Sequence, residues 1–332
     1  MNWRDDITWR DGERTITCKD GALDGAPEAL RWTGWDHYEL LTTERALADA
    51  PGALSENAAK VHQVRPGAVN EIAAELIGEV APVNLVALGG GRVIDTAKAI
   101  AAVKGVRVAA IPTTLSGAEM TGIHKLPDGH DAENLCRPVL VMADPTLMTA
   151  QPERERRASA MNALAHAADS LYTPLAHPVS RLAALEGARL IASGVDHPEH
   201  RRDLALGSLL AGYAIDSALF SLHHVICQSL VRVLRVPHAE TNAAILPRAV
   251  EALVLRAPAE MAGLASALGT EPGALTHRIE GLAGGRRSLG EVGADLEKLD
   301  STLDVIEARG ELQMTPDAPD RDELRRIIES AW

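Results

Sequence analysis

Residues 85–101 read LVALGGGRVIDTAKAIA, and this stretch decides the fold. An apolar run typical of a buried strand leads into three glycines, and an alanine-rich segment with helical spacing follows. Outward from it, further apolar runs at 38–43, 106–111 and 138–143 accompany a helical pattern at 70–80. Alternating strands and helices of this kind predict an α/β domain with a doubly wound parallel sheet.

The pattern changes after Pro152. From there to Trp332, apolar residues recur at helical spacing and strand signals are few. We therefore predict two domains, an α/β dinucleotide-binding domain over residues 1–150 and an all-α substrate domain over residues 151–332. No role is predicted for residues 255–332, where the pattern is helical and carries no recognisable chemistry.

Composition and charge exclude several classes of protein. The chain has 332 residues, of which 46% are hydrophobic and 24% charged, as in ordinary globular proteins. Its formal net charge of −13 argues against a general nucleic-acid binder. No apolar run is long enough for a membrane span, and the start, MNWRDDITWRDGERT, lacks the apolar core of a signal peptide. The cysteines match no zinc or disulfide spacing. We expect a cytoplasmic protein without a nucleic-acid or membrane partner.

The three glycines, Gly89, Gly90 and Gly91, stand between the predicted strand and helix. Glycines let a backbone approach a phosphate closely, and the free N–H groups of a helix start favour an anion. A plain tight turn explains the same glycines, and GGGRVID is not the GxGxxG dinucleotide fingerprint. Asp95 and Lys98, one turn apart on the helix, are likewise explained as a solvated ion pair.

A second motif, PTTLSGAE at residues 112–119, directly follows the next predicted strand. Its hydroxyl groups would lie at the carboxyl end of the parallel sheet, where such folds bind ligands. The alternative is a helix-capping turn, in which Thr114 or Ser116 caps the helix and Glu119 completes a capping box.

The third signal is a set of histidines in the helical region. Asn162 and His166 share one helix face, and His223, His224 and His238 follow much later. A lone histidine on an apolar helix is most often a buried core residue. Grouped, His166, His224 and His238 have the donor atoms to ligate Zn²⁺ or Fe²⁺, and they are equally suited to donating protons near neutral pH.

Together these segments resemble the iron-containing alcohol dehydrogenase superfamily, whose motifs follow in the same order and spacing. The family carries a strand followed by GGGS and D-x-A-K, and the corresponding stretch here is LVALGGGRVIDTAKAIA. The family also carries IPTT followed by S-E, and the corresponding stretch here is AIPTTLSGAEMT. Its DP before the helical domain appears as VMADPTLMTAQP. The resemblance runs from about residue 38 to 250. It implies a dehydroquinate synthase-like fold with an α/β and an all-α domain.

Within that superfamily the chain is similar to the maleylacetate reductases. They carry N-A-x-A-H-A, L-H-H and P-H-A-E-T, which stand here at residues 162–167, 222–224 and 237–241. This resemblance implies reduction of the carbon–carbon double bond of maleylacetate to give 3-oxoadipate, in the breakdown of aromatic compounds. It also implies NADH or NADPH as cofactor, operation without a metal, and a homodimer.

The absence of a metal also has a reason in the residues. Asn162 stands where the alcohol dehydrogenases of the superfamily carry an Asp, so a metal site would lose its only anionic protein ligand. Its affinity for a divalent ion should therefore fall. If a metal is bound, its expected ligands are His166, His224 and His238.

The resemblance further implies the nucleotide contacts. The residues that carry over are Gly89, Gly90, Gly91, Arg92, Asp95, Lys98, Thr113, Thr114 and Glu44. The glycines would hold the pyrophosphate, and the two threonines would border the phosphates and the nicotinamide. Glu44 would accept hydrogen bonds from the adenosine ribose and repel a 2′-phosphate, which favours NADH over NADPH. Arg92 replaces the family's small Ser, where it either adds a cation beside the pyrophosphate or crowds the loop.

We predict a nicotinamide-dependent reductase of the maleylacetate reductase type. Hydride would pass to an unsaturated or oxo acid in a cleft between the two domains, and imidazoles would stabilise the developing negative charge and supply the proton. The predicted catalytic residues are His238, His224, His166, Asn162 and His223. Gln228 departs from the family, which usually has His there, and Gln cannot serve as a general acid.

Three alternatives stay open at this point. A lyase, dehydratase or cyclase on the same scaffold suits the missing relay histidine and the altered phosphate loop. In such an enzyme the nucleotide would be absent or unreactive, and a chain that binds neither NADH nor NADPH would favour this alternative. A metal-dependent alcohol dehydrogenase would use the three imidazoles as ligands, which elemental analysis detects. A non-catalytic binding protein fits least well with the polar motifs that the chain retains.

Overall fold

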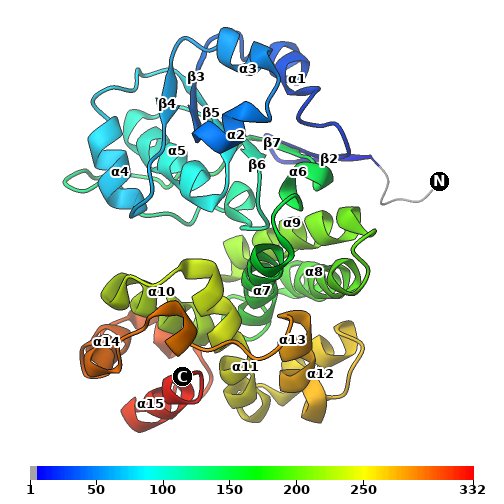
Figure 1. Cartoon of the computed structure of the whole chain (residues 1–332), viewed down its shortest axis with the longest axis vertical. Helices are drawn as coiled ribbons and strands as arrows, with labels where there is room; N and C mark the ends of the chain where they lie inside the picture. The colour runs from blue at the N-terminus through cyan, green and yellow to red at the C-terminus, as the bar shows by residue number, and fades with distance from the viewer. Residues whose placement is uncertain (1–5) are drawn as a thin grey trace. The chain divides into compact units, whose positions relative to one another are not determined.

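The computed structural model describes residues 6–332; residues 1–5, the first part of the polar start of the chain, lie outside the described residues. The chain divides into two compact units, residues 1–151 and 152–332 (Figure 1).

The first unit is an α/β fold around one seven-stranded sheet with strand order β1-β2-β7-β6-β5-β3-β4. The strands are β1 (Ile7–Asp11), β2 (Arg14–Cys18), β3 (Tyr38–Thr42), β4 (Val61–Gln63), β5 (Asn84–Gly89), β6 (Val108–Pro112) and β7 (Leu140–Ala143). The helices are α1 (Ala26–Trp32), α2 (Glu44–Ala48), α3 (Gly52–Glu56), α4 (Val69–Leu76), α5 (Gly91–Lys104), α6 (Pro145–Met148) and the short 3₁₀ helix η1 (Ala118–Met120).

Neighbouring strands from β2 to β4 pair in parallel, and β1 alone pairs antiparallel, with β2. The predicted doubly wound parallel sheet is therefore confirmed. The sequence did not predict the β1–β2 hairpin or β4. Both lie at the edges of the sheet, where short strands mix charged and apolar residues and lack a continuous apolar run.

Helices cover both faces of this sheet. Leu41, Leu85 and Ala87 belong to a buried cluster with residues of α4 and α5. Their neighbours in sequence, such as Leu40 and Val86, belong to a second cluster with residues of α1, α2 and α3. Because successive side chains of a strand point to opposite faces, strands buried on both sides read as continuous apolar runs.

The second unit is helical. Its α-helices are α7 (Glu153–Asp169), α8 (Pro178–Asp196), α9 (Arg201–Ala218), α10 (Leu222–Leu234), α11 (His238–Arg256), α12 (Pro258–Ala267), α13 (Leu275–Leu282), α14 (Leu299–Glu307) and α15 (Arg321–Glu329). Short 3₁₀ helices are η2 (Pro272–Ala274), η3 (Gly290–Val292), η4 (Leu296–Lys298) and η5 (Gly310–Met314). α7 packs against α8, α9, α10 and α11, so its side chains are buried from Ala158 to Asp169. The all-helical expectation for this half of the chain is confirmed.

Within residues 6–332, no single helix is long and apolar enough to cross a membrane. Helices α9 and α10 are long and apolar enough for a membrane span only when they are counted together, and the chain bends by 97° at the break between them.

Candidate active site

Three parallel strands of the first unit end side by side at one edge of the sheet. β5 pairs with β3 on one side and with β6 on the other, and Gly89 at the end of β5 accepts a hydrogen bond from the Thr113 N–H at 3.1 Å. The chain leaves β3 outward to β4 and returns to β5 on the opposite side of β3, so the winding reverses between these two strands. Open α/β sheets bind ligands at such a switch point, beside the carboxyl ends of the strands.

Two of the three glycines allow the loops after β5 and β6 to lie against each other. A Cβ on Gly90 would stand 2.9 Å from the Thr114 methyl group, and one on Gly91 would stand 3.0 Å from the Ser116 Cβ. Gly90 precedes the 14-residue helix α5 and offers its first turn no capping side chain. The Val93 N–H donates to the Gly90 carbonyl at 2.9 Å, which leaves the N–H groups of Gly91 and Arg92 at the start of the turn for an anion. This arrangement fits the pyrophosphate of a nicotinamide dinucleotide.

The loop after β6, residues 113–117, is called the Ser/Thr loop below. Ser116 Oγ accepts a long hydrogen bond of 3.4 Å from the Ala118 N–H. Glu119 does not return to complete a capping box, since both of its carboxyl oxygens are buried and have no hydrogen-bond partner among the described residues. The capping-box alternative is therefore wrong for Glu119.

The other predicted nucleotide contacts occupy different environments. Glu44 is the exposed first residue of α2, whose N-cap is Thr43. Arg92 is exposed in the first turn of α5. Lys98 Nζ lies 2.8 Å from Asp95 Oδ1, but the Lys98 side chain is 0% exposed, so the interpretation of this pair as a solvated ion pair is wrong. Whether these residues contact a nucleotide stays a prediction.

In the second unit the structure brings several predicted catalytic residues together. His166 on α7 and His224 on α10 stack with ring centroids 4.9 Å apart, and the His223 ring meets His224 edge-on, also at 4.9 Å. Asn162, one turn before His166, lies 3.5 Å from its Nε2 through the amide nitrogen. His238, the first residue of α11, is exposed.

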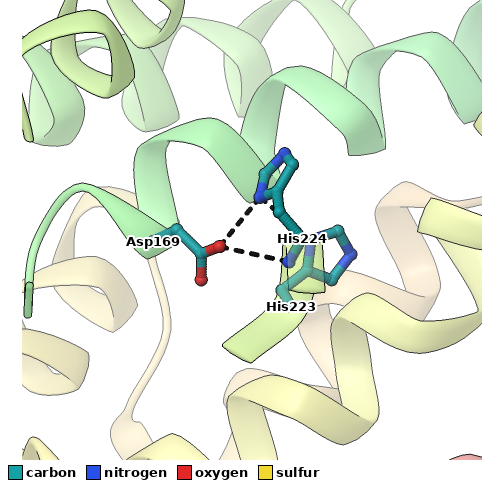
Figure 2. A group of neighbouring side chains, drawn as sticks. All are labelled: Asp169, His223 and His224. Atoms are coloured by element: carbon teal, nitrogen blue, oxygen red, sulfur yellow. Dashed lines mark hydrogen bonds and ion pairs between the residues drawn. The ribbon is translucent and has the colours of Figure 1, made fainter. Parts of the chain in front are cut away.

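Asp169, which was not among the predicted site residues, anchors this cluster (Figure 2). Its Oδ2 accepts hydrogen bonds from His224 Nδ1 at 2.8 Å and from the backbone N–H groups of His224 and Ser221 at 3.2 Å each. Its Oδ1 accepts the Tyr172 hydroxyl proton, and the Tyr172 oxygen in turn accepts from the Leu222 N–H at 3.1 Å. In the imidazole tautomer that carries its proton on Nδ1, toward Asp169, the lone pair is on Nε2.

A strained turn between α9 and α10 positions these donors. Leu219 has φ 57° and ψ −169°, a backbone conformation that is otherwise almost confined to glycine. The turn places the Ser221 N–H on Asp169 and the Phe220 ring 5.6 Å from the His224 ring. Such strain persists where surrounding contacts over-determine it and is frequent at functional sites. The continuous helical pattern of residues 201–234 gave no sign of this break.

The charge states of the cluster follow from burial and from these hydrogen bonds. Burial lowers the pKa of His166 well below its ordinary value, and the charges of His224, His238 and His223 lower it further. Burial also lowers the pKa of His223, to about 3. Burial acts to raise the pKa of Asp169, but the hydrogen bond from His224 and the nearby imidazole charges outweigh it and bring that pKa to about 2. Near neutral pH the cluster therefore combines a carboxylate with neutral His166 and His223.

Donor atoms for a divalent metal ion are present but weakly suited to it. Asp169, His223 and His224 offer ligand atoms within 4.8 Å of one another, yet the Asp169 oxygens already accept four hydrogen bonds. His224 Nε2 and His166 Nδ1 are buried and have no hydrogen-bond partner among residues 6–332. These nitrogens fit a neutral imidazole site, which lacks an anionic ligand because residue 162 is Asn.

Asp169 and Tyr172 were missed because their role depends on the fold. Asp169 stands three residues after His166, on the same helix face, and this spacing was the one available signal. Its partner His224 is 55 residues away in the sequence, and only the packing of α10 against α7 brings the two together.

Two family models together match nearly the whole chain. The model described as "Iron-containing alcohol dehydrogenase" matches residues 14–150, and that described as "Fe-containing alcohol dehydrogenase family, C-terminal" matches residues 157–332. Among curated relatives, maleylacetate reductase 1 of Rhodococcus opacus is 36% identical, over 75% of this chain and 72% of its own. Maleylacetate reductase of Burkholderia cepacia is 32% identical over 94% of each chain.

Solved structures agree with these matches. The crystal structure of maleylacetate reductase from Rhizobium sp. strain MTP-10005 superposes with a TM-score of 0.82 at 26% identity, and the alignment covers 98% of both chains. A 1,3-propanediol oxidoreductase superposes with a TM-score of 0.81 at 21% identity, over 95% of this chain and 97% of its own, and shares the fold.

Proposed function

This chain belongs to the iron-containing alcohol dehydrogenase superfamily, on the branch of the maleylacetate reductases, and from that premise we propose that it reduces maleylacetate or a closely similar unsaturated oxo acid. It is an NAD(P)H-dependent oxidoreductase that acts on a small-molecule acid. The product of the proposed reaction is the saturated oxo acid, 3-oxoadipate in the case of maleylacetate. We propose that it works as a homodimer in the cytoplasm.

The first unit would bind the nucleotide. Gly89, Gly90 and Gly91 at the start of α5 would face the pyrophosphate, and the half-buried Thr113 and Thr114 would border the phosphates and the nicotinamide. The exposed carboxylate of Glu44 would accept from the ribose hydroxyls, and we therefore propose NADH as the preferred cofactor. Bound NADH supplies the hydride.

The second unit would bind the acid and supply the proton that the reaction consumes. Hydride addition to a carbon–carbon double bond conjugated with a carbonyl leaves an enolate, so the enzyme must stabilise an oxyanion and deliver one proton to carbon. His224 suits this task because Asp169 fixes its orientation and stabilises its protonated form, while its Nε2 is buried without a hydrogen-bond partner among the described residues. This arrangement of Asp169 and His224 is the single observation that carries the proposal.

His166, His223 and His238 would support that step in different ways. His166 stacks on His224 and is neutral, so its contribution would be to orient the substrate and to limit access of water. His223 is fully buried and its ring meets that of His224 edge-on, so we propose for it a structural part beside His224. His238 is exposed, so it is the imidazole most accessible to the substrate and to a proton from solvent. Its charge lowers the pKa of His166.

We propose that the reaction needs no metal. Neutral Asn162 beside His166 supplies no anionic ligand for a divalent ion, and the nearby Asp169 carboxylate already accepts four hydrogen bonds, one of them from His224. If a metal were bound, His166, His224 and His238 would hold it and it would polarise a substrate oxygen. Activity that survives dialysis against a strong chelator, with metal content measured on the same sample, supports metal-free chemistry; activity restored only by added Fe²⁺ or Zn²⁺ contradicts it.

The experiment for the proposed function follows NADH oxidation by the purified chain with maleylacetate, with NADPH in parallel. We expect NADH oxidation with the substrate and none without it, and formation of 3-oxoadipate in equal amount. A chain that binds neither NADH nor NADPH, as judged by quenching of its tryptophan fluorescence, would instead be a lyase, dehydratase or cyclase on this scaffold.

A further inference from the structure

Two buried cations lie beside the Ser/Thr loop in the first unit. Arg14 on β2 is 1% exposed and Lys98 on α5 is 0% exposed, and they are the only buried lysine or arginine residues within residues 6–332. Burying a charge is unfavourable unless it is paired or hydrogen-bonded. Their contacts therefore indicate what these two residues hold in place.

Lys98 holds the chain that leaves the Ser/Thr loop. Its Nζ donates to the carbonyl oxygens of Ala118 and Ile123, each at 3.0 Å, and to Thr121 Oγ1 at 3.1 Å. It also pairs with Asp95 Oδ1 at 2.8 Å. The ammonium group is thus surrounded by four acceptors, three of which belong to residues 118–123, and this stretch is called the clamped segment below.

Arg14 holds the same segment from a second element. Its Nη2 donates to the carbonyl oxygens of Glu119 and Met120, each at 3.3 Å, and its Nε donates to the Pro138 carbonyl at 3.0 Å. Side-chain cations therefore bind the carbonyls of three consecutive residues, Ala118, Glu119 and Met120. These carbonyls belong to the three-residue helix η1, in which the Ala118 carbonyl also accepts a long hydrogen bond of 3.4 Å from the Thr121 N–H. A helix this short offers its carbonyls few hydrogen bonds of its own.

The clamped segment is continuous with the proposed nucleotide site. It begins at the residue after the Ser/Thr loop, in which Thr114 and Ser116 lie against Gly90 and Gly91. Lys98 itself belongs to α5, the helix whose first turn those glycines begin. One side chain thus ties the glycine side of the site to the Ser/Thr side, without any exposed surface of its own.

We propose that Lys98 and Arg14 are positioning residues, which fix the Ser/Thr loop relative to the start of α5 and thereby set the affinity for the nucleotide without touching it. The proposal rests on the proposed function in one respect, that these two loops bind the nucleotide. It departs from the expectation that Lys98 contacts the cofactor directly.

The test compares the affinity for NADH with the rate of the reaction. Lys98→Met removes the charge and three donors, and Lys104→Met on the same helix is the matched control. We expect Lys98→Met to raise the Kd and KM for NADH by about tenfold or more, and to leave kcat at saturating NADH and the KM for the acid within about threefold. Lys104→Met should change none of these values. A purely structural role would lower the melting temperature and leave the Kd of the folded protein unchanged.

A milder variant keeps the test decisive if Lys98→Met does not fold. Thr121→Val preserves shape and charge and removes one acceptor of the Lys98 ammonium, so we expect a rise of about two- to fivefold in the Kd for NADH.

Variants that bind NADH as tightly as the wild type overturn the proposal, while the proposed function stands. A wild type that binds NADH but does not reduce the acid overturns the proposed reaction and leaves this inference intact. A wild type that binds neither nucleotide overturns both.

Discussion

The two units each bury a polar cluster, and the clusters differ in how completely their polar atoms are bonded. In the first unit the Lys98 ammonium meets four acceptors and Arg14 meets three backbone carbonyls. In the second unit Asp169 is saturated by donors, but His224 Nε2 and His166 Nδ1 have no partner among the described residues. Buried polar groups are nearly always satisfied, so the exceptions mark places where another molecule or a proton is expected.

This difference separates a cluster that positions the backbone from a cluster that can exchange protons. A satisfied network rigidifies the chain around it, as Lys98 and Arg14 do for the clamped segment. An imidazole that is oriented on one side and unbonded on the other is arranged to exchange a proton. Glu119 is the exception within the cluster around Lys98 and Arg14, since its carboxyl group is buried beside both cations and has no hydrogen-bond partner in the described chain.

The largest expected effect concerns His238, the exposed imidazole whose charge lowers the pKa of His166 in the second cluster. His238→Ala should lower kcat by 10²–10⁴-fold, the usual range for loss of a group that takes part in proton transfer, because His238 is the imidazole most accessible to the substrate and to a proton from solvent. The Kd for NADH should stay unchanged. Stopped-flow NADH oxidation and fluorescence titration measure the two values on one preparation. A loss of NADH affinity with an unchanged kcat would place His238 on the nucleotide side and remove the contrast between the clusters.

The second prediction concerns Glu119. Burial raises the pKa of Glu119 from 4.5 to about 7, so the folded protein retains a proton that the unfolded chain has lost between these values. Stability should therefore fall by about 3 kcal/mol as the pH rises from 4.5 to 7, and Glu119→Gln should lack this fall. Denaturant unfolding followed by tryptophan fluorescence reports it. Wild-type and variant curves that run parallel over that pH range contradict the burial argument.

The third prediction tests the anchor of the second cluster. Asp169→Asn keeps the size of the side chain but cannot stabilise a protonated His224, so kcat should fall by about 10–100-fold. Asp322→Asn, at an exposed position on α15, is the matched control and should behave as the wild type. The Kd for NADH should stay constant in both variants. An unchanged kcat in Asp169→Asn would mean that the hydrogen bond to His224 is only structural.

The smallest effect is expected at Glu44. Glu44→Gln removes the negative charge proposed to repel a 2′-phosphate, so the preference for NADH over NADPH should narrow by a few fold. The ratio of kcat/KM values for the two cofactors measures it. A preference that does not move would place the ribose-binding carboxylate elsewhere and leave the comparison of the two clusters untouched.

The sequence predicted the central strands and the helical half of the chain well, for a physical reason. Strands buried on both faces and helices with one apolar stripe leave periodic signals, as at residues 85–101. The edge strands β1 and β4 leave weak signals, because one side of each is unpaired. The break at Leu219 left none, because the residues on both sides continue the same helical pattern.

The candidate site was predictable in its residue types and less so in its connections. His166 and His224 were selected by pattern, and the structure stacks them. Asp169, Arg14 and the buried state of Lys98 depend on contacts between residues far apart in sequence, such as the 55 residues between Asp169 and His224. Local spacing carries no information about such contacts, and Lys98 therefore looked like an exposed partner of Asp95.

The central claim is that the histidines of the second unit carry out the chemistry, while Lys98 and Arg14 in the first unit only set the affinity for the nucleotide. Single-turnover hydride transfer at saturating NADH, measured with the Kd for NADH on His238→Ala and Lys98→Met, tests it most directly. The account predicts that His238→Ala loses the rate and keeps the Kd, whereas Lys98→Met loses affinity and keeps the rate. Two variants that change the same parameter to the same extent would contradict it.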